Sequence, residues 1–397
     1  MGHFTLTNFP LKNKTVFLRV DFNVPIEKKK ITDDSKIIAS LDTIHFLLEQ
    51  DCKIILATHL GRPEGKIVNS LRLNLIARKL EELMKYKIIK LNDCIGKEVK
   101  SKIEKGKAKD IFLLENLRFY KEEEENDLTF AHSLASLANI YVNDAFAVSH
   151  RKNASVYAIT QFLPSLSGLL LEKEIKMLSK ALHPKKPAVW IMGGAKLNKV
   201  ELIEQAFDKA DYILIGGALA FAFLRAKGIS VGLSKTDTES VENAKKILKH
   251  KAAKKIILPL DFLVSEKFSS RAKTETVNFN QIKSNQIALD IGPETIKHFK
   301  MYLRKAHTIV WNGPLGYFEW MQFSKGTKEI GKFIGNLTAI SICGGGETVE
   351  AINKFHLQHN LSHLSTGGGA SLEFLSEKKL PGIEALERSY KKFKDRV

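Results

Sequence analysis

The chain has 397 residues but only three cysteines, and it lacks long uninterrupted apolar runs. Cys52, Cys94 and Cys343 do not have the close spacing of a metal-binding motif. We expect them to be buried, reduced thiols, which indicates a reducing compartment. The longest apolar stretch, residues 213–224, is interrupted by two glycines and is too short for a spanning helix of ~20 residues.

Several targeting and binding signatures are also missing. The first nine residues lack a basic segment followed by an apolar core, so we expect no secretory signal and a cytoplasmic location. No Gly-x-x-x-x-Gly-Lys-Ser/Thr motif occurs, which excludes a Walker-type phosphate loop. No Gly-x-Gly-x-x-Gly opens the first strand–helix turn, which disfavours a dinucleotide site.

The charge balance is strongly basic, with 62 lysines and arginines against 44 acidic residues and a net charge of +18. Such an excess suits nucleic acid, an anionic surface or phosphorylated small molecules. The lysines are scattered, and no zinc-finger or RNA-recognition signature is present. We therefore expect no primary role in nucleic-acid binding.

Short apolar runs alternate with helical patterns along the chain, which predicts an α/β fold with parallel sheets. Its length favours two domains. The predicted strands of the first half are residues 15–20, 53–58, 110–114 and 140–143, and the predicted helices are 35–49, 71–85 and 128–138. The predicted strands of the second half are residues 188–192, 212–215, 255–258, 308–311 and 339–343.

The boundary between the halves is predicted near residues 164–187. Residues 168–182 form a helical pattern that the following prolines, Pro184 and Pro187, stop. A helix between two α/β lobes suits a hinge. Residues 383–394 predict an amphipathic helix, whose apolar face must dock on another part of the chain.

Three glycine-rich turns follow predicted strands of the second half, and they begin at Gly193, Gly216 and Gly344. Ligands of open parallel sheets bind at the carboxyl ends of the strands, where glycine permits close approach and helix N-termini attract phosphate. One such turn is more often structural, but three favour a phosphate-bearing ligand. Lys196 directly follows the first turn, where its ammonium can reach phosphate oxygens.

Basic side chains follow the strands of the first half at the same sheet edge: His59, Arg62, Arg118 and Arg151. Guanidinium groups bind phosphate and carboxylate in bidentate fashion, so we expect a small, multiply anionic acid. Asp21 and Asn23 share a face after the first strand. Arg19 is predicted to be structural and to pair with Asp144 or Glu115, and the acidic run 122–125 to be a solvated loop.

Together these motifs resemble phosphoglycerate kinase. The matching segments are in order over nearly the whole chain and comprise residues 19–25, 59–63, 114–119, 143–151, 193–196, 311–319, 344–348 and 365–373. The resemblance implies two Rossmann-like, doubly wound parallel-sheet lobes joined by a hinge helix. The short length is similar to that of archaeal-type members. The implied reaction is the reversible, Mg²⁺-dependent transfer of a phosphoryl group from 1,3-bisphosphoglycerate to ADP, with closure about the hinge.

The resemblance also implies which segments of the chain bind each ligand. Residues 1–166 would bind 3-phosphoglycerate, 167–187 would be the hinge helix and linker, 188–375 would bind ADP or ATP, and 376–397 would pack back on the N-terminal lobe. The implied acid-binding residues are Asp21, Asn23, Lys36, His59, Arg62, Arg118 and Arg151. The implied nucleotide-binding residues are Gly194, Lys196, Gly216, Gly217, Asn312, Glu319, Gly345, Gly346, Glu347 and Thr348. A monomer is expected.

The sequence departs from the family pattern in three respects. Lys36 stands where the family usually carries a catalytic arginine, and it keeps the charge without the planar fork. Lys199 is a candidate for a second lysine, after a turn that looks one residue short, so the implied catalytic residues are Lys36, Lys196 and Lys199. Glu347 stands where an aspartate usually binds the metal. These changes leave a second hypothesis open, a relative that binds both ligands but catalyses poorly.

Overall fold

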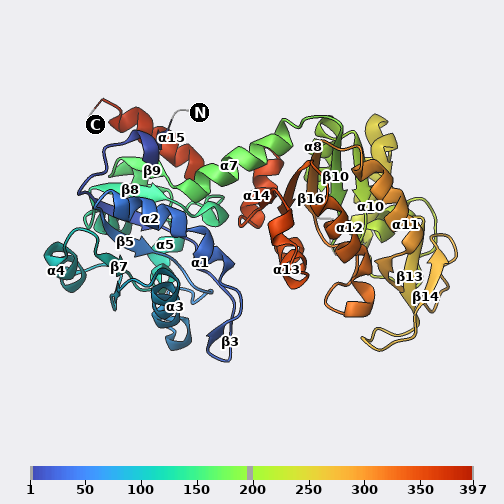
Figure 1. Cartoon of the computed structure of the whole chain (residues 1–397), viewed down its shortest axis with the longest axis horizontal. Helices are drawn as coiled ribbons and strands as arrows, with labels where there is room; N and C mark the ends of the chain where they lie inside the picture. The colour runs from blue at the N-terminus through green and yellow to red at the C-terminus, as the bar shows by residue number, and fades with distance from the viewer. Residues whose placement is uncertain (1–2, 195–199, 396–397) are drawn as a thin grey trace. The chain divides into compact units, whose positions relative to one another are not determined.

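The computed structural model describes residues 3–194 and 200–395 (Figure 1). It divides into two compact units, one built from the chain up to Ile175 and from Lys379 on, the other from Lys176 to Lys378. The division falls within helix α7 (Leu169–Leu182), which continues from one unit into the other. The predicted α/β class with two parallel sheets is confirmed, whereas the lobe boundaries drawn from the sequence remain a prediction.

The first unit contains a seven-stranded parallel sheet with the strand order β1-β9-β8-β2-β5-β7-β6. Its central strands are apolar and buried because helices cover both faces of the sheet. The strands are β1 (Phe4–Thr5), β2 (Thr15–Arg19), β5 (Lys53–Ala57), β6 (Ile88–Lys90), β7 (Ile111–Leu113), β8 (Ile140–Asn143) and β9 (Ser165–Ser167), beside a small hairpin of β3 (Ile26–Glu27) and β4 (Lys30–Ile31). The four predicted strands are confirmed; the unpredicted ones are short and lie toward the edges.

The helices of this unit follow the predicted pattern with one interruption. The predicted helix 35–49 is two helices, which meet at Ser40. The α-helices are α1 (Ser35–Ala39), α2 (Leu41–Glu49), α3 (Asn74–Met84), α4 (Lys97–Lys105), α5 (Lys121–Glu124), α6 (Leu128–Ala135) and α15 (Pro381–Phe393). Short 3-10 helices are η1 (Leu6–Asn8), η2 (Asn69–Leu71), η3 (Leu117–Phe119), η4 (Phe146–Val148) and η5 (Ala158–Gln161).

The C-terminal helix α15 packs on the first unit, beside β9 and η5 (Figure 1). The Tyr390 ring meets the Phe4 ring edge-on at 4.9 Å. The Ser389 hydroxyl donates a hydrogen bond to the Leu163 carbonyl at 3.1 Å. The predicted amphipathic helix thus finds its docking surface within this unit.

The second unit contains a six-stranded parallel sheet with the order β12-β11-β10-β16-β17-β18. Its strands are β10 (Ala188–Met192), β11 (Tyr212–Ile215), β12 (Ile256–Ile257), β16 (Thr308–Asn312), β17 (Ile340–Gly344) and β18 (His363–Leu364). The α-helices are α8 (Val200–Lys209), α9 (Leu219–Ala226), α10 (Thr238–Leu248), α11 (Pro293–Leu303), α12 (Lys325–Gly335), α13 (Gly346–Lys354) and α14 (Gly369–Leu375), with 3-10 helices η6 (Lys251–Lys255), η7 (Met321–Phe323) and η8 (Gln358–Asn360).

An antiparallel three-stranded sheet in the second unit was not predicted. It consists of β13 (Asp261–Ser265), β14 (Glu275–Asn278) and β15 (Ile287–Ile291), with β13 in the centre. Phe262 and Val264 of β13 are buried. This sheet supplies much of the apolar wall of the cavity described below.

All three cysteines are buried and unpaired, as predicted. Burial raises the pKa of Cys52 to about 11 and that of Cys343 to about 12, and it raises the pKa of Cys94 well above its ordinary value. The thiols are therefore protonated and poorly reactive at neutral pH. None of the helices in the described parts of the chain combines the length and apolar character that a membrane span needs.

Candidate functional site

A charged cluster lies at the carboxyl end of β2 in the first unit. The Lys36 ammonium, at the start of α1, donates a hydrogen bond to Asp21 Oδ2 at 2.7 Å. His59 Nδ1 lies 3.8 Å from Asp21 Oδ1. Asp21 and His59 are buried, whereas the Lys36 side chain keeps 31% of its surface exposed. The structure thus brings together three residues that the sequence predicted for acid binding.

Burial and neighbouring charge act in opposite directions on this cluster. Burial, the largest single effect, would raise the pKa of Asp21, but Lys36, His59 and Arg19 together lower it below its ordinary value. Burial lowers the pKa of His59 well below its ordinary value, against the attraction of Asp21. Because Arg19 Nη2 faces His59 Nδ1 at 3.5 Å, we assign the imidazole proton to Nε2. His59 is therefore a neutral hydrogen-bond donor near pH 7 rather than a positive charge.

The loop after β5 joins two more predicted residues. Asn23 Oδ1 accepts a hydrogen bond from the Gly61 backbone N–H at 2.9 Å, and Arg118 Nη1 donates to the Gly61 carbonyl at 2.8 Å. Arg118 Nε also contacts Glu124 at 3.2 Å. Gly61 has a φ of +65°, a conformation that favours glycine. This glycine therefore links two side chains from different strand ends.

The positive charge of a second arginine, Arg151, also acts on Arg118. Burial lowers the pKa of Arg118, and the positive charge of Arg151 adds to that effect. Arg151 is half-buried, and its Nε donates to His150 Nε2 at 3.1 Å. Arg62, beside Gly61, is exposed. Two like charges held close together are stabilised by an anion that binds both.

The prediction for the partners of Arg19 is wrong. Its side chain is buried, donates to the Ser155 hydroxyl at 2.8 Å and lies 3.9 Å from Glu123 Oε1. Glu123 is itself fully buried and accepts two hydrogen bonds from Ser155, so the acidic run is not wholly a solvated loop. Asp144 instead accepts from the Leu170 backbone N–H at the start of α7. The pairing depends on a loop more than 100 residues away, which a local pattern does not reveal.

Sequence reasoning missed Asn116, which organises this edge of the sheet. It is completely buried, accepts from the Leu60 N–H at 3.1 Å and donates to the Leu60 carbonyl at 2.8 Å. Its Oδ1 also accepts from the Arg118 N–H at 3.2 Å. Asn116 therefore holds the loops of His59 and Arg118 together. A buried amide within the segment 114–119 was the available signal.

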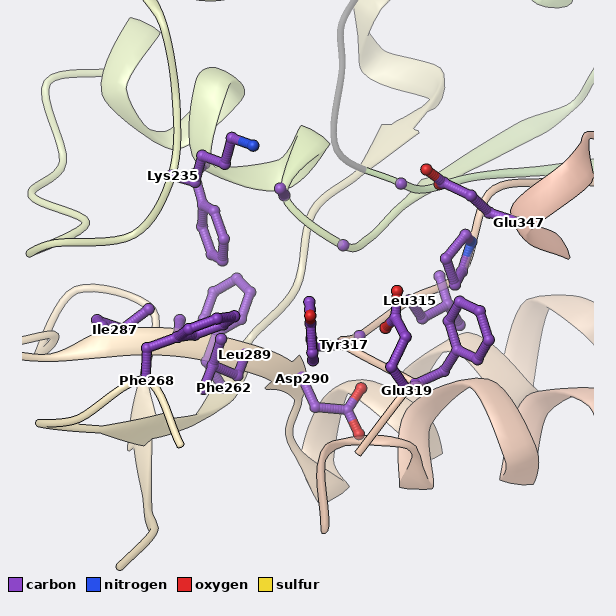
Figure 2. A pocket seen from close by; sticks show the side chains of 18 of the residues that line it. Lys235, Phe262, Phe268, Ile287, Leu289, Asp290, Leu315, Tyr317, Glu319 and Glu347 are labelled. Carbon is purple, nitrogen blue, oxygen red and sulfur yellow. The ribbon is translucent and has the colours of Figure 1, made fainter. Parts of the chain in front are cut away.

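A cavity of about 530 Å³ opens in the second unit (Figure 2). One end is lined by apolar and aromatic side chains of β13, β15 and nearby loops, including Phe262, Phe268 and Leu289. Glu319 and Glu347 lie toward the other end (Figure 2). An apolar slot with carboxylates at one end suits a flat ring that carries polar substituents.

Glycine turns at the ends of β10, β11 and β16 form the floor of this cavity. Gly194 and Gly217 line it and have φ values of +86° and +59°. A Cβ at Gly217 would lie 2.7 Å from the Pro314 carbonyl oxygen, and one at Gly193 only 2.1 Å from it. The three turns therefore approach each other at distances that only glycine permits.

The other residues predicted to bind nucleotide lie around this floor. Asn312 is buried, its Nδ2 donates to the Gly344 carbonyl at 3.0 Å, and its Oδ1 has no hydrogen-bond partner in the described structure. The buried Thr348 hydroxyl accepts from the Gly313 N–H at 2.6 Å. Gly216 follows β11, Gly345 caps the N-terminus of α13, and Gly346 is the first residue of that helix. Lys196 and Lys199 lie outside the described residues.

The same arrangement of motifs is found in a known family. A family model described as phosphoglycerate kinase matches residues 6–378. The chain belongs to the phosphoglycerate kinase family. A phosphoglycerate kinase of Moorella thermoacetica is 44% identical over 390 residues, covering 97% of this chain and 99% of that protein. One of Trichodesmium erythraeum is 45% identical over 390 residues, covering 96% and 98%.

Solved phosphoglycerate kinase structures share the whole fold. The enzyme of Coxiella burnetii is 38% identical, with a TM-score of 0.87 and coverage of 98% of this chain and 99% of that one. The enzyme of Pyrococcus horikoshii is 33% identical, with a TM-score of 0.86 and coverage of 98% and 100%. Both halves of the chain therefore belong to the phosphoglycerate kinase architecture.

The acidic side chains near the cavity offer few protein ligands for Mg²⁺. Glu347, in the first turn of α13, is exposed and lines the cavity. No group of three or more His, Cys, Asp or Glu side chains suited to a metal occurs within residues 3–194 and 200–395. Mg²⁺ typically uses one or two carboxylates with waters and substrate phosphates. This donor set fits a magnesium ion that arrives with the nucleotide.

Proposed function

We propose that this chain catalyses the reversible transfer of a phosphoryl group from 1,3-bisphosphoglycerate to ADP, giving 3-phosphoglycerate and ATP. The observation that carries the proposal is the cluster of Lys36, Asp21 and His59 at one sheet edge of a phosphoglycerate kinase fold. Beside it, Gly61 links Asn23 and Arg118. The aromatic-lined cavity of the second unit supports it. Glycolysis in the forward direction, or its reversal, is the corresponding pathway.

The first unit is proposed to hold the acid. Arg62, Arg118 and Arg151 bind the phosphate and carboxylate groups, because planar guanidinium groups match both. Neutral His59 donates through Nε2, and Asn23 holds the Gly61 loop in place. Asp21 accepts a hydrogen bond from a ligand hydroxyl while it orients Lys36.

The second unit is proposed to hold the nucleotide. Its base fits the aromatic end of the cavity, and Glu319 accepts hydrogen bonds from the ribose hydroxyls. Gly194, Gly216, Gly217, Gly345 and Gly346 let the backbone approach the phosphates, with Asn312 and Thr348 holding the turns together. The first N–H groups of α13 face this end and favour anions. Lys196 and Lys199 are the proposed phosphate-binding cations here.

The proposed phosphoryl transfer depends on positive charge around the transferred group rather than on a covalent bond to the protein. In-line transfer spreads negative charge over three equatorial oxygens, so positioned cations lower its barrier. Lys36 supplies such a cation from the first unit, and Lys196 and Lys199 supply others. Glu347 would hold Mg²⁺, which neutralises phosphate charge when bound.

The proposal extends to organisation and location. Residues 1–166 form the acid-binding lobe, 167–187 the hinge helix and linker, 188–375 the nucleotide-binding lobe, and 376–397 the tail that packs on the first lobe. The buried thiols agree with a reducing cytoplasm. We propose a monomer, since each ligand site is built from one unit of one chain.

The proposal is tested by ADP release from ATP in the presence of 3-phosphoglycerate. Arg118→Ala removes a buried guanidinium, so we expect kcat/KM for 3-phosphoglycerate to fall by about 100-fold, the effect of losing charge-assisted hydrogen bonds. Arg78→Ala, on the exposed face of α3, is the control and should change it less than twofold. Unchanged kinetics in Arg118→Ala would remove the acid site from this cluster. Salt-dependent nucleic-acid binding that survives Arg118→Ala and Arg151→Ala would instead favour a nucleic-acid role.

A further inference from the structure

The cavity of the second unit contains one lysine at its otherwise apolar end. Lys235 is the only cationic side chain among the described residues that line the cavity. Its neighbours there include Phe262, Phe268 and Ile287 (Figure 2). Within residues 3–194 and 200–395, no hydrogen bond or ion pair involves its ammonium group. An exposed ammonium that lines a cavity with aromatic walls is available to a ligand.

The backbone around Lys235 is held against the cavity wall. The Leu233 N–H donates to the Gln286 carbonyl at 2.8 Å, and the Ala288 N–H donates to the Ser234 hydroxyl at 2.9 Å. Gly232 makes this approach possible, because a Cβ there would lie 2.3 Å from the Lys283 carbonyl oxygen. Lys235 is therefore placed by β15 and by the preceding loop, and is not a side chain of a loose surface segment.

The position of Lys235 indicates whether it would contact the base or the phosphates of a bound nucleotide. Glu347, in the first turn of α13 where phosphates are expected, lies at the opposite end of the cavity from Lys235 and Phe268 (Figure 2). Leu233 and Phe268 are 61% and 55% exposed at the lysine end, an apolar rim that a base would cover. The lysine therefore meets the base of a bound nucleotide rather than its phosphates.

An ammonium group can distinguish purine bases by the hydrogen-bond donors and acceptors on their edges. It has three donors and no acceptor. A guanine or hypoxanthine edge presents O6 and N7, which are both acceptors, whereas adenine presents N7 beside the N6 amino donor. The lysine therefore complements a 6-oxopurine and meets a like donor on adenine.

We propose that Lys235 is a specificity-determining residue that favours 6-oxopurine nucleotides, GDP and IDP, relative to a cavity without this lysine. The inference rests on the proposed nucleotide site in this cavity. It predicts that the chain binds IDP and GDP alongside ADP, with the lysine setting the ratio between them. IDP isolates the contribution of O6, because hypoxanthine lacks the 2-amino group of guanine.

The test is calorimetric titration of the full chain with ADP, IDP and GDP, which is independent of turnover. Lys235→Leu and Lys235→Met each remove the donor, and Lys235→Arg retains it. Lys246→Leu, on the exposed face of α10, makes the same charge change outside the cavity. Thermal melting of each variant checks that the fold is retained.

We expect the ratio of IDP affinity to ADP affinity to fall about tenfold in Lys235→Leu and Lys235→Met, the loss of one charge-assisted hydrogen bond. Lys235→Arg and Lys246→Leu should keep that ratio within twofold. An unchanged ratio in both apolar variants overturns the inference, as does an equal loss for all three nucleotides, which would place the lysine at the phosphates. If the chain binds nucleotides but shows no turnover, the proposed function is wrong. The ratio of IDP affinity to ADP affinity can still be measured in that case.

Discussion

The contact between Lys36 and Asp21 helps to keep a buried carboxylate ionised in the first unit. The lysine is partly exposed while the aspartate is buried, and their atoms are 2.7 Å apart. A buried carboxylate that keeps its charge needs a nearby cation, and the lowered pKa of Asp21 reflects that partnership. Lys36 therefore has a structural role toward Asp21 and a proposed catalytic role toward the transferred group.

The substitution of Lys36 separates these two roles. In Lys36→Arg the charge remains and a bidentate fork becomes available, so single-turnover transfer measured by rapid quench should be retained or faster. In Lys36→Met we expect a loss of about 100-fold or more, because a cation facing the transition state is removed. Slower transfer in Lys36→Arg would contradict the assignment of Lys36. Lys102→Met, which breaks an exposed 2.7 Å pair with Glu98, is the control and should leave transfer unchanged.

At the scale of residues, the sequence predicted polar groups at strand ends but not their partners. The grouping of Asp21, His59 and Arg118 follows from parallel strands ending at one edge. The pair of Arg19 with Glu123 and Ser155 requires a contact across 136 positions of the chain, from Arg19 to Ser155. The protonation of His59 likewise depends on burial, which is a property of the fold.

At the scale of elements, helix α15 supports the loop that carries Arg151. The Gly382 N–H donates to the Ser149 carbonyl at 2.8 Å. A Cβ at Gly382 would lie 2.9 Å from Ser149 Cβ and 3.0 Å from its Cα. Ser149 is itself fixed, because its hydroxyl accepts from Asn143 and donates to the Ala145 carbonyl. A larger residue at position 382 must therefore displace the loop.

Gly382→Ala tests this support. An alanine normally stabilises a helix relative to glycine, but here we expect destabilisation by about 1–3 kcal/mol from overpacking. The KM for 3-phosphoglycerate should rise several-fold more than the KM for ADP. Urea unfolding and steady-state kinetics measure the two effects. Lys391→Ala, exposed on the same helix, should change neither, and a stabilised Gly382→Ala with normal kinetics would refute the account.

The antiparallel sheet escaped the sequence prediction for a physical reason. The antiparallel strands β13, β14 and β15 are short and lack a helical crossover between them, so they do not repeat the βαβ alternation. Strands β13 and β15 nevertheless contribute much of the apolar wall of the cavity. The glycine turns in the sequence predicted one side of the proposed nucleotide site, whereas its aromatic side, which this sheet supplies, was not predicted. The break at Ser40 was missed because the apolar pattern continues through it.

At the scale of the whole molecule, each unit contains one of the two proposed binding surfaces. The first presents arginines, a lysine and a neutral histidine, and the second presents an apolar cavity with glycine turns. Both expected substrates are polyanions, and the net charge of +18 favours their approach. The proposed phosphoryl transfer therefore needs both surfaces.

The most direct measurement is ATP formation by the purified full chain supplied with 1,3-bisphosphoglycerate, ADP and Mg²⁺. We predict multiple turnovers, on the order of 1–1000 per second as for typical enzymes. Calorimetry with ADP on the same preparation establishes that the nucleotide binds. Intact ADP binding without ATP formation would contradict the account and leave a binding protein built on a kinase fold.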